Sequence, residues 1–146
     1  MERFEDLDCW KLGRELSRGI YAITKATPFN KDYGLMDQIR RAAVSVMTNI
    51  SEGFERGTNK DFAKFLYIAR GSAGETRSLL YVALDQGYID QKEFNEYRNL
   101  CLRCSKVIYG LIKHVLKHSD WKTGLKILII GWLVSLTGTT SLISWF

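Results

Sequence analysis

Proline and cysteine are scarce in this chain, which holds one proline and three cysteines among its 146 residues. A single proline beside 12 glycines favours helices over a turn-rich all-β fold. The odd number of cysteines argues against a framework of disulfide bonds. The N-terminal string MERFEDLDCW lacks the apolar run of a secretory signal, so we expect a cytoplasmic protein in a reducing setting.

Strings that mark common enzyme classes are missing as well. The sequence has no phosphate-binding G-x-x-x-x-G-K-[ST], no G-x-S-x-G and no zinc-binding H-E-x-x-H. Neither His114 nor His118 has a glutamate three residues before it, as a di-iron bundle would require. No nucleophile has a candidate base beside it. The sequence therefore predicts no catalytic residues, no metal and no cofactor.

The composition is that of an ordinary globular protein with a moderate excess of positive charge. It is 46% hydrophobic and 25% charged, and its formal net charge is +5. The length fits one domain, and no linker-like stretch interrupts residues 1–120. This charge permits nucleic acid or an anionic lipid surface as a partner without selecting either.

Four amphipathic segments with their own start and stop signals predict four helices. The expected spans are residues 7–25 with Asp6 or Asp8 as N-cap, residues 35–55 ended by Gly57, residues 58–87 opened by Thr58 and Asp61, and a span from Asp90 to about Val115 with Glu93 completing a capping box. The connections are too short for long crossovers. We therefore expect an all-α fold, an antiparallel up-down-up-down four-helix bundle, over residues 1–120.

The segment 39–57, IRRAAVSVMTNISEGFERG, carries the most information. One face of the helix holds an apolar stripe at core spacing, formed by Ile39, Ala43, Val46, Ile50 and Phe54. Val44 and Met47 widen the apolar surface beyond what one neighbouring helix needs, which indicates a second contact surface. Alternatively, the paired arginines of this segment are simply solvated and Asn49 caps a neighbouring helix.

Small residues inside the last two spans allow more than one interpretation. Cys101 and Cys104 form a C-x-x-C pair, but they lie at helical spacing in the predicted core stripe, and no second pair completes a zinc site. Core packing is the favoured reading, with metal or redox use as the alternative. Gly71 and Gly74 weaken their helix, which suggests that another backbone approaches closely there, unless both are merely tolerated.

Two basic ridges are expected to face away from the core. The first helix carries Lys11, Arg14, Arg18 and Lys25, and the last carries Lys92, Arg103, Lys106, Lys113 and Lys117, with Arg98, His114 and His118 nearby. No acidic residue lies between Glu96 and Asp120. Because the first and last helices are neighbours in such a bundle, the ridges should merge into a surface that suits a phosphate backbone. A solvated face that keeps the protein soluble is the alternative.

Three strings, FEDLDCW, YGLMDQIRRAAVSVMTNISEGFERG and FLYIARGSAGET, resemble a known family over residues 4–117. These are bacterial four-helix-bundle proteins encoded in intervening sequences of large-subunit ribosomal RNA genes, and they include the accessory variability protein of diversity-generating retroelements. The resemblance implies a non-enzymatic basic bundle that assembles as a ring, typically a pentamer. In the retroelement branch it implies binding to nucleic acid and to a reverse transcriptase.

Carried over by position, the family's signature residues implied here are Arg40, Arg41, Ser45, Asn49, Glu52, Gly53 and Arg56, followed by Arg70, Gly71, Ser72 and Glu75. We expect them to build the seam of the bundle and of its oligomer. If the second and third spans are antiparallel about Gly57, residues whose numbers add up to about 114 lie side by side. This register predicts an ion pair from Arg40 or Arg41 to Glu75. Met47 stands where the family usually has proline, so this helix is expected to be straighter.

The last 20 residues, 127–146, carry no charge and follow Lys122 and Lys126. That length can span a bilayer, and the flanking lysines fit an anchored helix with its bundle in the cytoplasm. Six serines and threonines and two glycines dilute the segment. The alternatives are an apolar C-terminal extension, residues 121–146, packed on the bundle or its oligomer, and a disordered extension from a shifted reading frame.

Two functions from different classes follow. The first is an oligomeric basic bundle that binds RNA or DNA, as an accessory to a reverse transcriptase or a similar nucleic-acid enzyme, by multivalent electrostatics. The second is a purely structural or protein-interaction bundle whose charge only maintains solubility, with membrane tethering through the tail as a variant.

Overall fold

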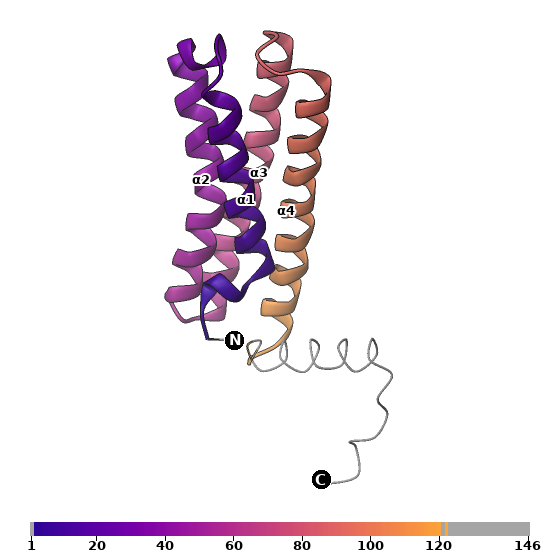
Figure 1. The fold of residues 1–146 in the computed structure, drawn as a ribbon. Coiled ribbons are helices and arrows are strands. Elements are labelled where there is room, and N and C mark those ends of the chain that lie inside the picture. The colour runs from indigo at the N-terminus through magenta and orange to yellow at the C-terminus, as the bar shows by residue number, and fades with distance from the viewer. Residues whose placement is uncertain (1, 121, 123–146) are drawn as a thin grey trace, which may run out of the picture.

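The computed structural model describes residues 2–120 and 122, and it contains four long helices joined by short turns (Figure 1). They are α1 (Asp8–Thr24), α2 (Tyr33–Glu55), α3 (Asn59–Asp85) and α4 (Gln91–Lys117), with short 3₁₀ turns at Phe4–Asp6 and Phe29–Lys31. Successive helices run antiparallel, and α4 packs beside both α3 and α1. The four-helix bundle and all four spans predicted from sequence are confirmed within a few residues.

The core of the bundle is one continuous apolar cluster to which every helix contributes. Ile39, Ala43, Val46 and Ile50 of α2 are fully buried and Phe54 is nearly so, which confirms the predicted stripe. Fully enclosed side chains from the other helices include Leu16, Ile20, Leu66, Leu80 and Ile108. This packing places the opposite, polar face of each helix in solvent.

The start and stop signals predicted for α2, α3 and α4 are present in the structure. Asp90 and Glu93 form the predicted capping box of α4, and the hydroxyl of Thr58 accepts a hydrogen bond from the Asp61 amide. The Asp61 carboxylate accepts from the Thr58 hydroxyl, because aspartate is one methylene shorter than the glutamate of a full capping box. The turns after α2 and α3 close at Gly57 (φ 82°) and Gly87 (φ 71°), a backbone region that favours glycine.

The predicted N-cap of α1 is wrong. Leu7 occupies the cap position without a side-chain hydrogen bond, Asp6 ends the preceding 3₁₀ turn, and Asp8 is the first helical residue. Leu7 is buried in the core. Its burial fixes where α1 begins, so the helix starts there without a side-chain cap. Asp8 still complements the positive end of the helix dipole.

The apolar tail predicted as an anchor or extension, residues 127–146, lies outside the described residues. In the described part of the chain, no helix has the length and apolar character needed to cross a membrane. Helix α2 continues through Met47 without interruption.

Candidate nucleic-acid interface

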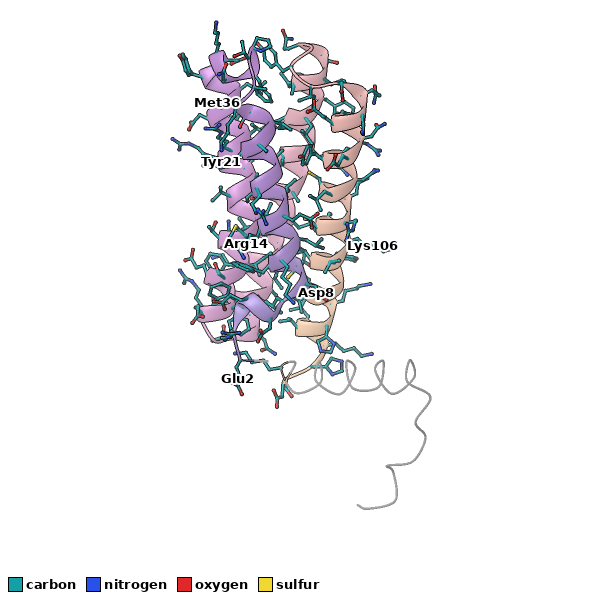
Figure 2. The ribbon with its side chains drawn as sticks, in the orientation of Figure 1. Glu2, Asp8, Arg14, Tyr21, Met36 and Lys106 are labelled. Atoms are coloured by element: carbon teal, nitrogen blue, oxygen red, sulfur yellow. The ribbon has the colours of Figure 1, made fainter. Side chains whose placement is uncertain are left out.

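The outer face of α4 carries an uncompensated row of positive charge. Its members are exposed, and they are Lys92, Arg103, Lys106, Lys113 and Lys117. Arg98 is half-buried beside them. Within residues 2–120 and 122 none of these cations forms an ion pair, and the sequence of α4 has no acidic residue after Glu96. Figure 2 shows Lys106 on the side of α4 away from α1. The row is therefore available to an anionic partner.

The predicted ridge on α1 is also exposed, but neighbouring groups compensate part of its charge. Lys11 pairs with Asp8 at 3.6 Å, and the guanidinium of Arg14 lies 5.8 Å from the centre of the Trp10 ring. Arg18 and Lys25 are exposed without an ion pair in the described part of the chain. The α1 ridge therefore offers fewer free charges than the α4 face.

The two ridges meet at a groove of about 480 Å³ between α1 and α4. Arg18 and Arg103 line it from opposite helices, but so do the carboxylates of Glu15 and Glu96. The floor is built by Tyr97, whose ring packs against Gly19 so closely that a Cβ atom there would overlap it. Burial, followed by the charges of Glu96 and Glu93, raises the pKa of Tyr97. The two ridges therefore do not merge into one uniformly basic surface here, because the groove between them carries both positive and negative charge.

A second basic face, which sequence reasoning missed, lies between α3 and α4. Arg70 of α3 donates a hydrogen bond from Nε to the Ser105 hydroxyl of α4 at 3.2 Å, and its guanidinium lies 4.5 Å from the centre of the Tyr109 ring. The Lys113 ammonium lies 4.9 Å from the same ring. Arg70 is one of the residues expected in the seam of the bundle and its oligomer, and it joins two helices of one chain. The spacing of Ser105, Tyr109 and Lys113, one turn apart on α4, was the available signal.

The serine and asparagine signature residues meet at the contact of α2 with α3. The hydroxyls of Ser45 and Ser72 are 2.8 Å apart, and Asn49 Nδ2 donates to the Ser45 hydroxyl and carbonyl at 2.8 Å each. Glu52 and Arg56 form an exposed ion pair of 2.9 Å on α2 alone. The polar network therefore joins two helices of one chain.

The predicted ion pair from Arg40 or Arg41 to Glu75 is wrong. Arg41 pairs with Asp37 at 2.9 Å on its own helix, and Arg40 donates to the buried Thr24 hydroxyl of α1 at 2.8 Å. Ser45 and Ser72 meet, which still leaves Glu75 nearly level with Arg41, so the directions of the two arginine side chains and not the helix register exclude the predicted pair. Arg40 also points toward α1, where it lies 4.6 Å from the Tyr21 ring centre, so it faces away from α3.

The three cysteines are buried in the core, as their helical spacing predicted, and none forms a disulfide. Burial raises the pKa of each thiol from an ordinary value of 9.0 to about 12. Across the described residues, no three His, Cys, Asp or Glu side chains cluster as metal ligands would. The C-x-x-C pair thus packs as two small apolar residues.

Cysteine alkylation should report this burial directly. At pH 8 a pKa of about 12 in place of 9.0 leaves about a thousandfold less thiolate, which is the reactive form. We expect iodoacetamide to leave Cys9, Cys101 and Cys104 unmodified in the native protein and to modify all three in guanidinium, as read by mass spectrometry. Rapid native labelling of the pair on α4 would contradict core packing.

Comparison with known proteins places this geometry in context. A family model described as 23S rRNA-intervening sequence protein matches residues 5–110. Among solved structures, one similar chain is a Bacteroides thetaiotaomicron protein of unknown function described as from the S23 ribosomal protein family. It shares 24% identity and a TM-score of 0.66 over 72% of this chain and 95% of its own. This likeness shows the fold. No curated protein matches the chain.

Proposed function

The chain belongs to the 23S rRNA-intervening sequence protein family, and from its surface we propose that it is a non-enzymatic bundle that binds nucleic acid through the outer face of α4. The uncompensated positive charge of that face carries the proposal. A protein cation that neutralises a phosphate releases condensed counterions, so several unpaired cations in a row yield affinity that falls as salt rises. Such contacts position a nucleic acid without reading its sequence.

The proposed contact residues are the sequence-predicted set, weighted by what surrounds each of them. Lys106, Lys113 and Lys117 form the centre, because they are exposed and no carboxylate lies near them on α4. Arg18 and Arg103 contribute at the edge, where Glu15 and Glu96 reduce the local potential. Lys11, Arg14, Lys25 and Arg98 extend the surface to either side.

Reversing two charges of the α4 face should weaken binding and change its salt dependence. For the Lys106→Glu, Lys117→Glu double variant, we expect RNA affinity at 50 mM salt to fall at least about tenfold. The slope of log affinity against log salt should become shallower by about 1.5, because two phosphate contacts are lost. Fluorescence anisotropy with a labelled RNA across a salt series measures both quantities.

The matched control reverses two exposed lysines away from α4, with Lys31→Glu and Lys60→Glu in one chain. It has the same net charge as the test variant, so a general effect of charge would weaken both equally. Equal losses, or wild-type binding that is absent or indifferent to salt, would overturn the proposal and favour the purely structural bundle.

We further propose that the protein assembles with copies of itself, as a ring of five, through the outer face of α3. Added Cβ atoms at Gly71 and Gly74 would meet nothing within 4 Å in the chain, so no packing inside the chain accounts for these glycines, and the close approach of a second copy would account for them. Tyr67, Ile68 and Val82 are exposed apolar groups on the same helix. A ring would multiply the α4 faces and raise affinity by multivalency.

A reverse transcriptase or similar nucleic-acid enzyme is the partner that this proposal includes. The resemblance to a family that includes a retroelement accessory protein supports it, and a basic ring would hold template and enzyme together. A pull-down of the ring with the enzyme encoded beside its gene, with and without nuclease, tests the idea. Capture that persists after nuclease treatment supports a direct contact, whereas its loss would place the nucleic acid between them.

A further inference from the structure

The face between α3 and α4 combines an exposed aromatic ring with cations from both helices. Tyr109 is 41% exposed, and it contacts the guanidinium of Arg70 and the ammonium of Lys113. The hydrogen bond from Arg70 to Ser105 holds the guanidinium in place, while Lys113 is exposed and has no ion pair in the described part of the chain. The Tyr109 ring thus lies between Arg70, which is held in place by a hydrogen bond, and Lys113, which is free to move.

Positive charge continues along this face without a nearby carboxylate. Arg77 of α3 is half-buried and lies close enough to α4 to favour the Cys101 thiolate electrostatically. Between Asp61 and Asp85 the only acidic residue of α3 is Glu75, which is turned about 140° around the helix from Arg70. A second exposed tyrosine, Tyr81, packs edge-on against Phe94 of α4 toward the far end of the same helix pair.

Aromatic rings flanked by cations distinguish a single strand from a duplex. The bases of a duplex are paired and stacked inside it, so a protein side chain at its surface contacts mainly the sugar-phosphate backbone. The bases of a single strand are free to stack on an aromatic side chain, which strengthens binding whatever the sequence. The groove between α1 and α4 also holds a tyrosine and two arginines, but its two carboxylates would repel the phosphates of a bound strand.

Building on the proposed nucleic-acid function, we infer that the face between α3 and α4 binds single-stranded nucleic acid, with Tyr109 as a stacking platform for one base. Arg70 supports the ring from the protein side. The arriving base displaces Lys113 from the ring, and the freed ammonium pairs with the phosphate of the same nucleotide. Arg77 of α3 and Lys106 of α4 would contact the phosphates of the neighbouring nucleotides of the bound strand.

The test compares Tyr109→Ala and Tyr109→Phe with Tyr21→Ala. Tyr21 is a matched control on α1. It is also 41% exposed, and its ring also contacts an arginine, Arg40 of α2. The probes are a labelled 12-nucleotide RNA, a DNA of the same sequence, and the duplex of that DNA. Thermal unfolding by circular dichroism verifies that each variant is folded.

We expect Tyr109→Ala to weaken binding of the single strands by about 5- to 150-fold, while Tyr109→Phe and Tyr21→Ala stay near wild type. Affinity for the duplex and its salt slope should be unchanged. Equal losses for RNA and DNA support stacking alone, and a larger loss for RNA adds a contact to the 2′-hydroxyl at the same platform.

Other outcomes separate this inference from the function on which it rests. Salt-dependent binding that Tyr109→Ala leaves intact, or weakens equally for duplex and single strand, overturns the platform while the basic α4 face stands. A wild-type protein that binds none of the probes overturns both. If Tyr109→Ala fails to fold, Tyr109→Leu decides, since it keeps apolar bulk but removes the aromatic face and should weaken single strands while leaving the duplex unchanged.

Discussion

Replacing Gly53 by alanine should lower the free energy of unfolding by about 1–3 kcal/mol, although alanine is the better helix former. A Cβ atom at Gly53 of α2 would lie 2.6 Å from the Cβ of Phe65 and 3.4 Å from the Cα of Phe62, both on α3. Neither atom can move away without its backbone. The two helices would have to separate near the turn that joins them, and the buried contacts there would loosen. Chemical denaturation followed by circular dichroism measures the loss.

The matched control is Gly110→Ala, the same substitution inside a long helix where a Cβ atom meets nothing within 4 Å and where no contact between copies is proposed. Its expected effect has the opposite sign, a gain of up to about 1 kcal/mol, because only helix propensity changes. If both variants gained stability alike, the close crossing at Gly53 would be refuted. A loss of stability at Gly53 alone would also explain why the family resemblance includes a glycine at this position.

A leucine at Gly71 should dissociate the proposed ring while leaving each chain folded. The chain itself has room for the new side chain, so the monomer loses nothing and gains helix propensity. A neighbouring copy packed against the outer face of α3 would instead meet an inserted side chain. Overpacking of about 1–3 kcal/mol per contact corresponds to about a 5- to 150-fold shift in the concentration for half-dissociation. Size-exclusion chromatography with light scattering measures mass across a dilution series.

Gly110→Leu provides the control for assembly, because Gly110 is also an exposed glycine inside a helix with open space around it, but on α4. It should leave the mass of the wild-type ring unchanged. Dissociation by both variants would move the contact away from α3, and a monomeric wild type would reject self-assembly altogether. Circular dichroism of the same samples separates dissociation from unfolding.

The position of each helix could be read from the chain because the signals are local. Periodic apolar residues, the capping box at Asp90, the glycines at Gly57 and Gly87 and the stripe from Ile39 to Phe54 act within one or two helical turns. The N-cap of α1 was predicted wrongly because Leu7 takes that position through its burial in the assembled core, which no local capping signal reports.

The candidate site was harder to predict than the fold, because it depends on which helix faces meet. Periodicity predicted correctly that Lys106 and Lys113 face away from the core, since that property belongs to one helix. The partners of Arg40 and Arg70 belong to two helices, and the predicted ion pair to Glu75 failed because Arg40 is directed to Thr24 of α1 and Arg41 pairs with Asp37 on its own helix.

Sequence alone determined the class of this protein: an all-α bundle of the intervening-sequence family, with its core stripe and a basic α4. Only the tertiary structure decided where free positive charge remains. It put Glu15 and Glu96 into the groove between α1 and α4, and it brought Arg70 of α3 onto Tyr109. The physical reason is that a helix's own residues set its apolar face, whereas the rotation and register of its neighbours are set by packing across the whole core.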